Sequence, residues 1–143
     1  MVGHLTRNIK ISPGPDYGWG FRILVYRFLD GTTVRDGFVN LDSVELYGCG
    51  QYDTTNACLD FQTVQGPAGY TSITNSAIHS GGGYGININQ ASGFTITNNV
   101  IARCTSFLVN ALTIQNFTFT GNLLIGAMKR TFAISGIDPV ACF

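Results

Sequence analysis

Charged residues are scarce in this sequence, since Asp, Glu, Lys and Arg make up only 11% of the chain. The eight basic and eight acidic residues balance to a formal net charge of zero, and no basic run occurs. We therefore expect no binding to nucleic acid or to an anionic membrane surface, because both require clustered positive charge. No apolar stretch approaches the roughly 20 residues that span a bilayer, so no membrane contact is predicted for this segment.

Acidic residues are absent between Phe61 and Ile137. Glycosidases and lyases usually need two or more carboxylates on one face, or carboxylates that hold calcium beside a basic residue. The candidate binding residues all precede this gap, and they are Asp42, Glu45 and Asp60, with Asp53 nearby. We interpret Asp60 and Glu45 as members of a solvated strand face, and we predict no catalytic residue.

Metal-binding and nucleophilic patterns are also missing. The two histidines, His4 and His79, are far apart in the sequence and cannot form a metal site alone, so no metal or cofactor is predicted. His79 falls in a largely apolar row, which favours a packed, hydrogen-bonded histidine. The run Gly81–Gly85 lacks the Lys and the following helix of a phosphate-binding loop, and we interpret it as a tight corner.

An internal repeat is what the sequence offers instead. The segments Ser72–Ile78, Thr95–Ile101 and Thr118–Leu124 superpose at one constant step, from position 73 to 96 to 119. Glu45–Cys49 fits as an earlier copy at a slightly longer step, with Leu46 set on Ile73. A second strand family follows the same steps through Leu59–Phe61, Ile86–Ile88 and Val109–Ala111. The extra length of the first step falls in Gln65–Gly69, a turn-forming stretch that can absorb an insertion.

Repeats of this length indicate stacked supersecondary units. No helical periodicity survives between the strands, which argues against a leucine-rich repeat, and short alternating runs such as Phe94–Thr97 are punctuated by Asn and Gly. The sequence therefore predicts an all-β fold, a right-handed parallel β-helix in which each coil stacks on the next. The right hand follows from the chirality of parallel crossover connections.

The repeat also predicts which side chains stack. We expect two inward ladders, one of Ile73, Ile96 and Phe119 and one of Ala77, Val100 and Leu123. Asn75 and Asn98 fall at a corner, where Asn tolerates left-handed backbone dihedrals and its amide can bond along the stack. Glu45 is placed in the row of Thr95 and Thr118.

The chain is predicted to be a single domain of 143 residues. Residues 1–37 are expected to be an irregular entry, about 38–126 the regular coils, and 127–143 an irregular excursion. The opening Met1–Arg7 lacks the apolar core of a signal peptide, and no polar cap is evident near Phe143. Both features favour a fragment of a longer β-helix.

The cysteines, the aromatic residues and one glycosylation motif bear on the compartment. Of the cysteines Cys49, Cys58, Cys104 and Cys142, the first two could close a local disulfide, while buried free thiols remain the alternative. Asn116–Thr118 is the only N-x-S/T motif, and its Asn aligns with a corner on the outside, where an oligosaccharide could attach. Five aromatics fall in turns, where sugar-stacking sites often lie, although scattered surface aromatics are normal: Tyr17, Trp19, Tyr52, Tyr70 and Tyr84.

Three blocks of the sequence resemble a known family. Leu5–Ile11 is similar to the segment that enters the β-helix of fibrocystin-like proteins, Val44–Gln51 resembles their "VEL..CGQ" coil, and Ser72–His79 resembles the coil that follows. This family includes fibrocystin, fibrocystin-like receptors and the related cell-surface hyaluronidases. The resemblance implies a large extracellular protein, often membrane-anchored and often associated with cilia.

The hyaluronidase branch of that family differs from this chain in the strand that carries its active-site histidines. There the strand after the "CGQ" coil resembles "YPIHFH", with histidines facing outward, whereas Ala57–Gln62 carries Asp60 and Gln62 at the outward positions. Glutamine exchanges no proton near neutral pH and a lone Asp lacks a partner, so we expect no depolymerisation of hyaluronan.

The sequence thus favours a non-catalytic structural or binding segment that contacts the remainder of its own chain and an extracellular protein or glycan. Two alternatives remain open. One is a carbohydrate-processing β-helix with catalytic residues partly outside this segment, and the other is a scaffold subunit of an extracellular filament.

Overall fold

The computed structural model describes residues 9–15 and 20–142. His4, Tyr17, Trp19, Phe143 and most of the Leu5–Ile11 block lie outside these residues, as does the side chain of Cys142. The described chain contains thirteen strands and no helix, which confirms the all-β prediction. The strands are β1 (Ile9–Ile11), β2 (Ile23–Asp30), β3 (Thr33–Asp36), β4 (Asn40–Asp42), β5 (Val44–Tyr47), β6 (Leu59–Gln62), β7 (Thr71–Thr74), β8 (Ala77–His79), β9 (Ile86–Thr97), β10 (Val100–Ala102), β11 (Phe107–Thr120), β12 (Leu123–Ile125) and β13 (Arg130–Cys142).

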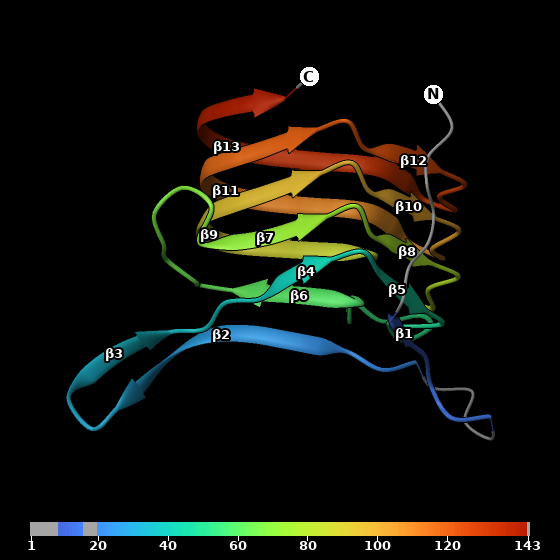
Figure 1. Ribbon diagram of the computed structural model, residues 1–143, viewed down its shortest axis with the longest axis horizontal. Helices are drawn as coiled ribbons and strands as arrows, with labels where there is room; N and C mark the ends of the chain where they lie inside the picture. Colours follow the sequence, from blue (N-terminus) through green and yellow to red (C-terminus); the bar gives the residue numbers. More distant parts are fainter. Residues whose placement is uncertain (1–8, 16–19, 143) are drawn as a thin grey trace.

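The strands form two sheets that the chain visits in turn (Figure 1). The smaller sheet has the order β1-β5-β8-β10-β12, and the larger has the order β13-β11-β9-β6-β2-β3, with β4 and β7 joined to it through β9. Nearly all neighbouring strands run parallel, and the antiparallel exception is the hairpin of β2 and β3. Each long strand β9 and β11 contributes two faces, because left-handed residues such as Gln90 and Thr113 bend it.

The register that the sequence predicted for the later coils is confirmed. Ile73 pairs with Ile96, and Ile96 pairs with Phe119, in neighbouring parallel strands. Ile73 and Ile96 are fully buried and Phe119 packs against the core, so this row faces inward as predicted. The second strand family is also confirmed, since Leu59, Ile86 and Val109 are successive partners.

The second predicted ladder has the right register but the wrong direction. Val100 pairs with Ala77 and with Leu123, yet Leu123 is 52% exposed because this row faces outward. The inward row is instead formed by the next residue of each strand: Ile78, Ile101 and Leu124. The cause is the left-handed corner residue, at φ 51° in Asn75, which interrupts the alternation of side chains between the strands on either side of it.

The step between the first coils is longer than the sequence predicted, because Leu46 pairs with Ile78 and not with Ile73. The partner of Ile73 is Leu41. A second insertion, in the loop 50–57, accounts for the difference, since the segment between Leu46 and Leu59 is longer than the equivalent segment between Ile78 and Ile86. Glu45 therefore lies in the row of Ala77 and Val100, and its predicted place beside Thr95 and Thr118 is wrong.

Most of the predicted irregular excursion over 127–143 is another strand of the stack, since β13 extends over Arg130–Cys142. β13 pairs in parallel with β11, with Phe107 opposite Arg130 and Val109 opposite Phe132, which continues the step of the preceding coils. The two basic residues Lys129 and Arg130 obscured the repeat, because no earlier coil has charge at those positions. The entry segment is also partly regular, since β1 pairs with β5 and β2 pairs with β6.

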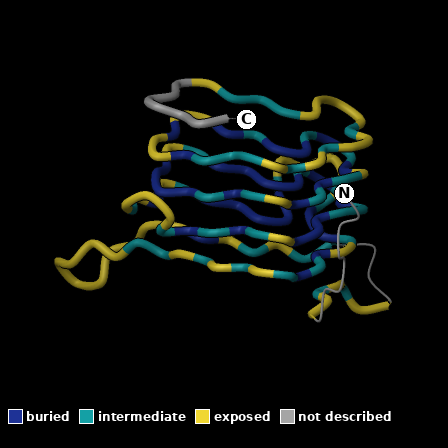
Figure 2. Tube along the Cα trace, turned by 45° about the horizontal axis from the view of Figure 1, so that its top comes forward, coloured by how far each residue is buried: buried dark blue, intermediate teal, exposed yellow. Residues whose placement is uncertain are grey.

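The core is one cluster of buried apolar side chains. Figure 2 shows that the buried residues gather along the successive strands of the stack. Phe61, Phe94 and Phe117 are its largest fully buried members. Asn75 and Asn98 have left-handed dihedrals, as predicted, and Ser43 and Gly121 adopt them at the equivalent corner of other coils. Two asparagine side chains that the sequence did not single out bond the backbone next to this corner. Asn99 Nδ2 donates to Ile73 O at 2.8 Å, and Asn122 Nδ2 donates to Ile96 O at 2.8 Å.

Candidate functional site

The three candidate acidic residues lie on three different outer faces of the stack. Asp42 ends β4, which pairs with β7; Glu45 is on β5 of the smaller sheet; Asp60 is on β6. Their closeness in sequence therefore does not bring their carboxylates together. Each of the three residues has its own side-chain partners.

Asp60 is buried, so its predicted place on a solvated strand face is wrong. Its side chain is 3% exposed, and Arg22 Nη2 lies 2.5 Å from Oδ2. Gln62 Nε2 and Asn87 Nδ2 donate to Oδ1 at 2.6 and 2.9 Å. Asn110 extends this ladder by donating to Asn87 Oδ1 at 2.8 Å. The carboxylate is thus fully paired within the protein and holds β2 and its neighbouring strands together.

Asp42 serves a corner of the stack. Its Oδ1 accepts hydrogen bonds from Asn75 Nδ2 at 2.7 Å and from Thr74 Oγ1 at 2.9 Å. These bonds lower the pKa of the Asp42 carboxyl below its ordinary value, with the Asn75 contribution the larger. The residue therefore joins one coil to the next at the surface.

Glu45 is the centre of a small polar cluster on the outer face of the smaller sheet. Lys10 Nζ lies 3.0 Å from its Oε1, and His79 Nε2 lies 3.1 Å from the same atom. The Lys10 ammonium also stands 4.3 Å from the centre of the Tyr47 ring, which meets the His79 ring edge-on. The hydrogen bond from Lys10, followed by that from His79, lowers the pKa of the Glu45 carboxyl.

The chemistry of this cluster is limited by its single carboxylate. Glycoside hydrolysis by the usual route needs two carboxyl groups that face each other across the bond. Within the described residues, Glu45 has only basic and aromatic neighbours in the cluster. Among the described residues, no second acid is placed beside the Glu45 carboxylate and the His79 imidazole. The row above the cluster is apolar and partly exposed: Val100, Ala102, Leu123 and Ile125.

Cys49 and Cys58 form a disulfide whose Cα atoms are 4.7 Å apart. It closes the loop 50–57, which packs directly on the run Gly81–Gly85. The run bends between β8 and β9, which agrees with the predicted corner. A Cβ on Gly83 would lie 2.3 Å from Asn56 O, so close approach also requires glycine there. Cys104 is a buried free thiol, and burial raises its pKa to about 11, which keeps it protonated at neutral pH.

Asn116 is exposed, at a corner opposite Gly93. Its left-handed backbone, with φ 47°, turns the chain before Phe117 enters the core. Of the other turn aromatics, Tyr52 is 71% exposed, Tyr70 donates its hydroxyl to Asp36 O at 2.8 Å, and Tyr84 packs edge-on against Phe107.

Residues 9–15 and 20–142 contain neither a metal-binding cluster nor a membrane-spanning helix. No group of three His, Cys, Asp or Glu side chains there could hold a metal ion. That part of the chain also has no helix of the length and apolarity needed to cross a bilayer.

A family model described as the right-handed β-helix region matches residues 31–138. The match begins in the β2–β3 turn and ends within β13, so it covers β3 to β12 and the first part of β13. No curated protein and no solved structure gives a match to the chain.

Proposed function

Because the chain belongs to the right-handed β-helix family, we propose that it is a non-catalytic structural and binding segment of a longer solenoid. The parent is a large extracellular protein of the fibrocystin-like kind, placed at a cell or cilium surface. The segment packs against the remainder of its own chain and presents its outer faces to an extracellular protein or glycan. Function depends on such sites, since one fold supports many activities.

The separation of the three acidic residues carries the non-catalytic part of this proposal. Asp42, Glu45 and Asp60 face different sides of the stack, and each is engaged by neighbouring coils. An acid–base pair for glycoside cleavage requires two carboxyl groups a few ångströms apart. Their contacts instead fit a structural role, joining strands that lie 32 to 38 residues apart in sequence.

The extracellular part of the proposal rests on two local features. The Cys49–Cys58 disulfide fits an oxidising compartment, where such bonds persist. The exposed Asn116 lies in the single glycosylation motif and could carry an oligosaccharide there. The resemblance of Val44–Gln51 to the fibrocystin-like coil supports the same location.

Incubation of the intact protein with high-molecular-mass hyaluronan tests the proposal. Size-exclusion chromatography is expected to show an unchanged polymer. Chain shortening that is abolished by Asp60→Asn, in a variant whose circular dichroism matches the wild type, would contradict the non-catalytic function.

A carbohydrate-processing activity is the second candidate, and the Lys10–Glu45–His79 cluster favours it. This cluster joins a carboxylate, an imidazole and an ammonium group on one outer face. If it acts on a glycan, Glu45→Gln removes the activity while the fold persists, because the carboxylate is a quarter exposed and makes no core contact. The same hyaluronan assay, extended to neutral polysaccharides, distinguishes the two candidates.

A further inference from the structure

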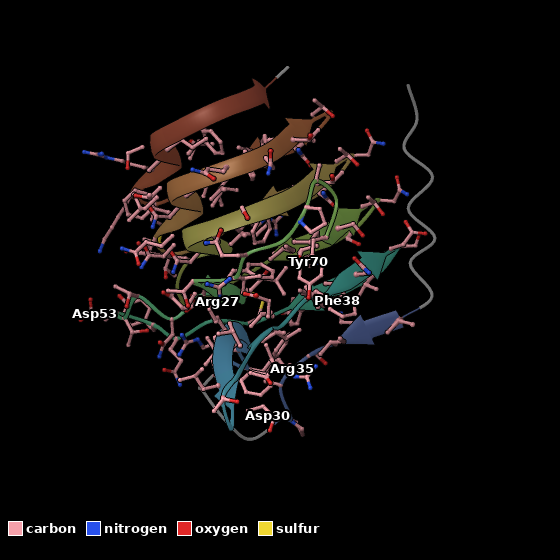
Figure 3. The ribbon with its side chains drawn as sticks, turned by 90° about the vertical axis from the view of Figure 1, so that its left-hand side faces the viewer. Arg27, Asp30, Arg35, Phe38, Asp53 and Tyr70 are labelled. Carbon is pink, nitrogen blue, oxygen red and sulfur yellow. A yellow bond between two sulfur atoms is a disulfide. The ribbon has the colours of Figure 1, made fainter. Side chains whose placement is uncertain are left out.

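The disulfide loop forms one wall of a pocket on the outside of the stack. The pocket has a volume of about 250 Å³. Its first wall is Tyr52–Thr54, from the insertion that the loop 50–57 carries relative to later coils. The other walls are Thr105–Ser106 and Met128–Lys129, which are equivalent corners of two successive later coils. Residues distant in sequence thus meet at this pocket. In Figure 3, Asp53 lies on a different side of the molecule from Arg35 and Asp30 of the β2–β3 hairpin.

The loop is fixed in place before any ligand arrives. The Cys49–Cys58 disulfide closes its base, and Gln51 N donates to Asn56 O at 3.2 Å across it. Thr54 Oγ1 donates to Gln51 O at 3.0 Å and accepts from Asn56 N at 3.1 Å. A Cβ on Gly82 would lie 3.0 Å from Tyr52 N, so the loop lies directly on the next coil. Such rigidity lowers the entropic cost of binding.

The side chains around the pocket are poised for a ligand with both polar and apolar surfaces. Tyr52 is 71% exposed although its ring is apolar. Asp53 and Lys129 are exposed and carry opposite charges, and no ion pair of either is found among the described residues. Ser106 is 5% exposed and also lines the pocket.

We propose that this pocket binds a neutral sugar unit of a glycan. A sugar hydroxyl both donates and accepts, so one unit can donate to the Asp53 carboxylate and accept from the Lys129 ammonium. The Ser106 hydroxyl offers a further donor and acceptor, and the apolar C–H face of the sugar stacks on the Tyr52 ring. Because the two charges cancel, an acidic sugar would gain from Lys129 and lose to Asp53. The inference rests on the proposed binding function and names the ligand class for it.

Glycan binding to the intact protein provides the test. The probes are neutral oligosaccharides of glucose, galactose, mannose and N-acetylglucosamine, with hyaluronan and heparin fragments as acidic comparisons. At least one neutral probe is expected to bind and the acidic probes to bind more weakly. By calorimetry, Tyr52→Ala is expected to weaken that binding about fivefold, since an aromatic contact contributes about 1 kcal/mol. Tyr52→Phe retains binding, whereas Asp53→Asn and Lys129→Gln each weaken it.

Tyr26→Ala is the matched control, because Tyr26 is also exposed, at 50%, but lies on β2 away from the pocket. Failure of every neutral probe to bind overturns the inference, as does binding that Tyr52→Ala and Lys129→Gln leave unchanged. Binding of acidic probes alone, lost in Lys129→Gln, overturns the neutral-sugar assignment. Cleavage of a bound neutral probe leaves the pocket in place and contradicts only the non-catalytic function.

Discussion

The Arg22 guanidinium lies 2.5 Å from the Asp60 carboxylate and joins positions that are 38 residues apart. Asp60 is 2% exposed, while the Arg22 side chain is 32% exposed and covers it from the solvent side. A carboxylate on an outward strand position is thus made part of the interior by one long cationic side chain.

Asp60→Ala is expected to destabilise the protein by about 3 kcal/mol, because breaking a buried pair leaves Arg22, Gln62 and Asn87 without their acceptor. Urea unfolding followed by circular dichroism measures this. Asp30→Ala is the matched control, since Asp30 and Arg35 form an exposed pair at 3.6 Å, and its effect is expected to stay within about 0.5 kcal/mol. Equal effects of the two variants would show that Asp60 is not buried in solution.

The direction of the outward and inward rows can be tested by truncation. Ile96→Ala is expected to cost about 2–5 kcal/mol, because Ile96 is fully buried between Ile73 and Phe119. Leu123→Ala, at a position 52% exposed, is expected to cost less than about 1 kcal/mol. A larger loss for Leu123→Ala in chemical denaturation would mean that the smaller sheet faces the other way.

Periodicity alone predicted the register but not the direction of every row. Identical steps place Val100 between Ala77 and Leu123 whichever way they face. Whether a row faces inward or outward depends on the left-handed residue Asn75, which interrupts the inward–outward alternation of side chains. The sequence alone does not show how many residues of a corner fall outside this alternation. The first step is also longer than the sequence predicts. Two insertions contribute to it, one at Gln65–Gly69 and one in the loop 50–57, and the repeat pattern indicates only the former.

The sequence does not predict which residues surround the candidate acidic residues. Burial of Asp60 depends on Arg22, which precedes the matched coils and lies outside the repeat. The pocket lined by Tyr52 and Lys129 forms because the loop 50–57, an insertion in one coil, lies beside the corners of two later coils. Tyr52 was found among the turn aromatics, but no linear pattern connects it with Lys129, which lies three coils later in the chain.

Glu45 is expected to make stability depend on pH. Lys10 and His79 lower the pKa of its carboxyl, so the ionised form is favoured by folding. The resulting stabilisation is fully present above the ordinary pKa of Glu and disappears as the pH falls through the lowered value. Thermal unfolding of the wild type and Glu45→Gln is therefore expected to differ at pH 6 and to converge toward pH 3. A gap that stays constant over this range would rule out the ionised Glu45 as its source.

Asn116 is expected to carry an N-linked glycan when the protein is made in a secretory pathway. The residue is exposed at a corner of the stack, where an oligosaccharide can attach. Peptide-N-glycosidase treatment should lower the apparent mass of the wild type, and Asn116→Gln and Thr118→Ala should each remove the shift. Mass spectrometry that finds unmodified Asn116 in the secreted protein would remove this support for an extracellular location.

Removal of the Cys49–Cys58 disulfide is expected to loosen the loop 50–57 more than the stack. Closing a loop of this length contributes about 2–3 kcal/mol in the chain-entropy model, so the Cys49→Ser, Cys58→Ser double variant should unfold at lower urea concentration. The core cluster remains, because Phe61, Phe94 and Phe117 do not depend on the loop. Hydrogen exchange should therefore rise at Gln51–Asn56 while β9 and β11 stay protected. Loss of protection throughout β9 and β11 would instead make the disulfide necessary for the stack itself.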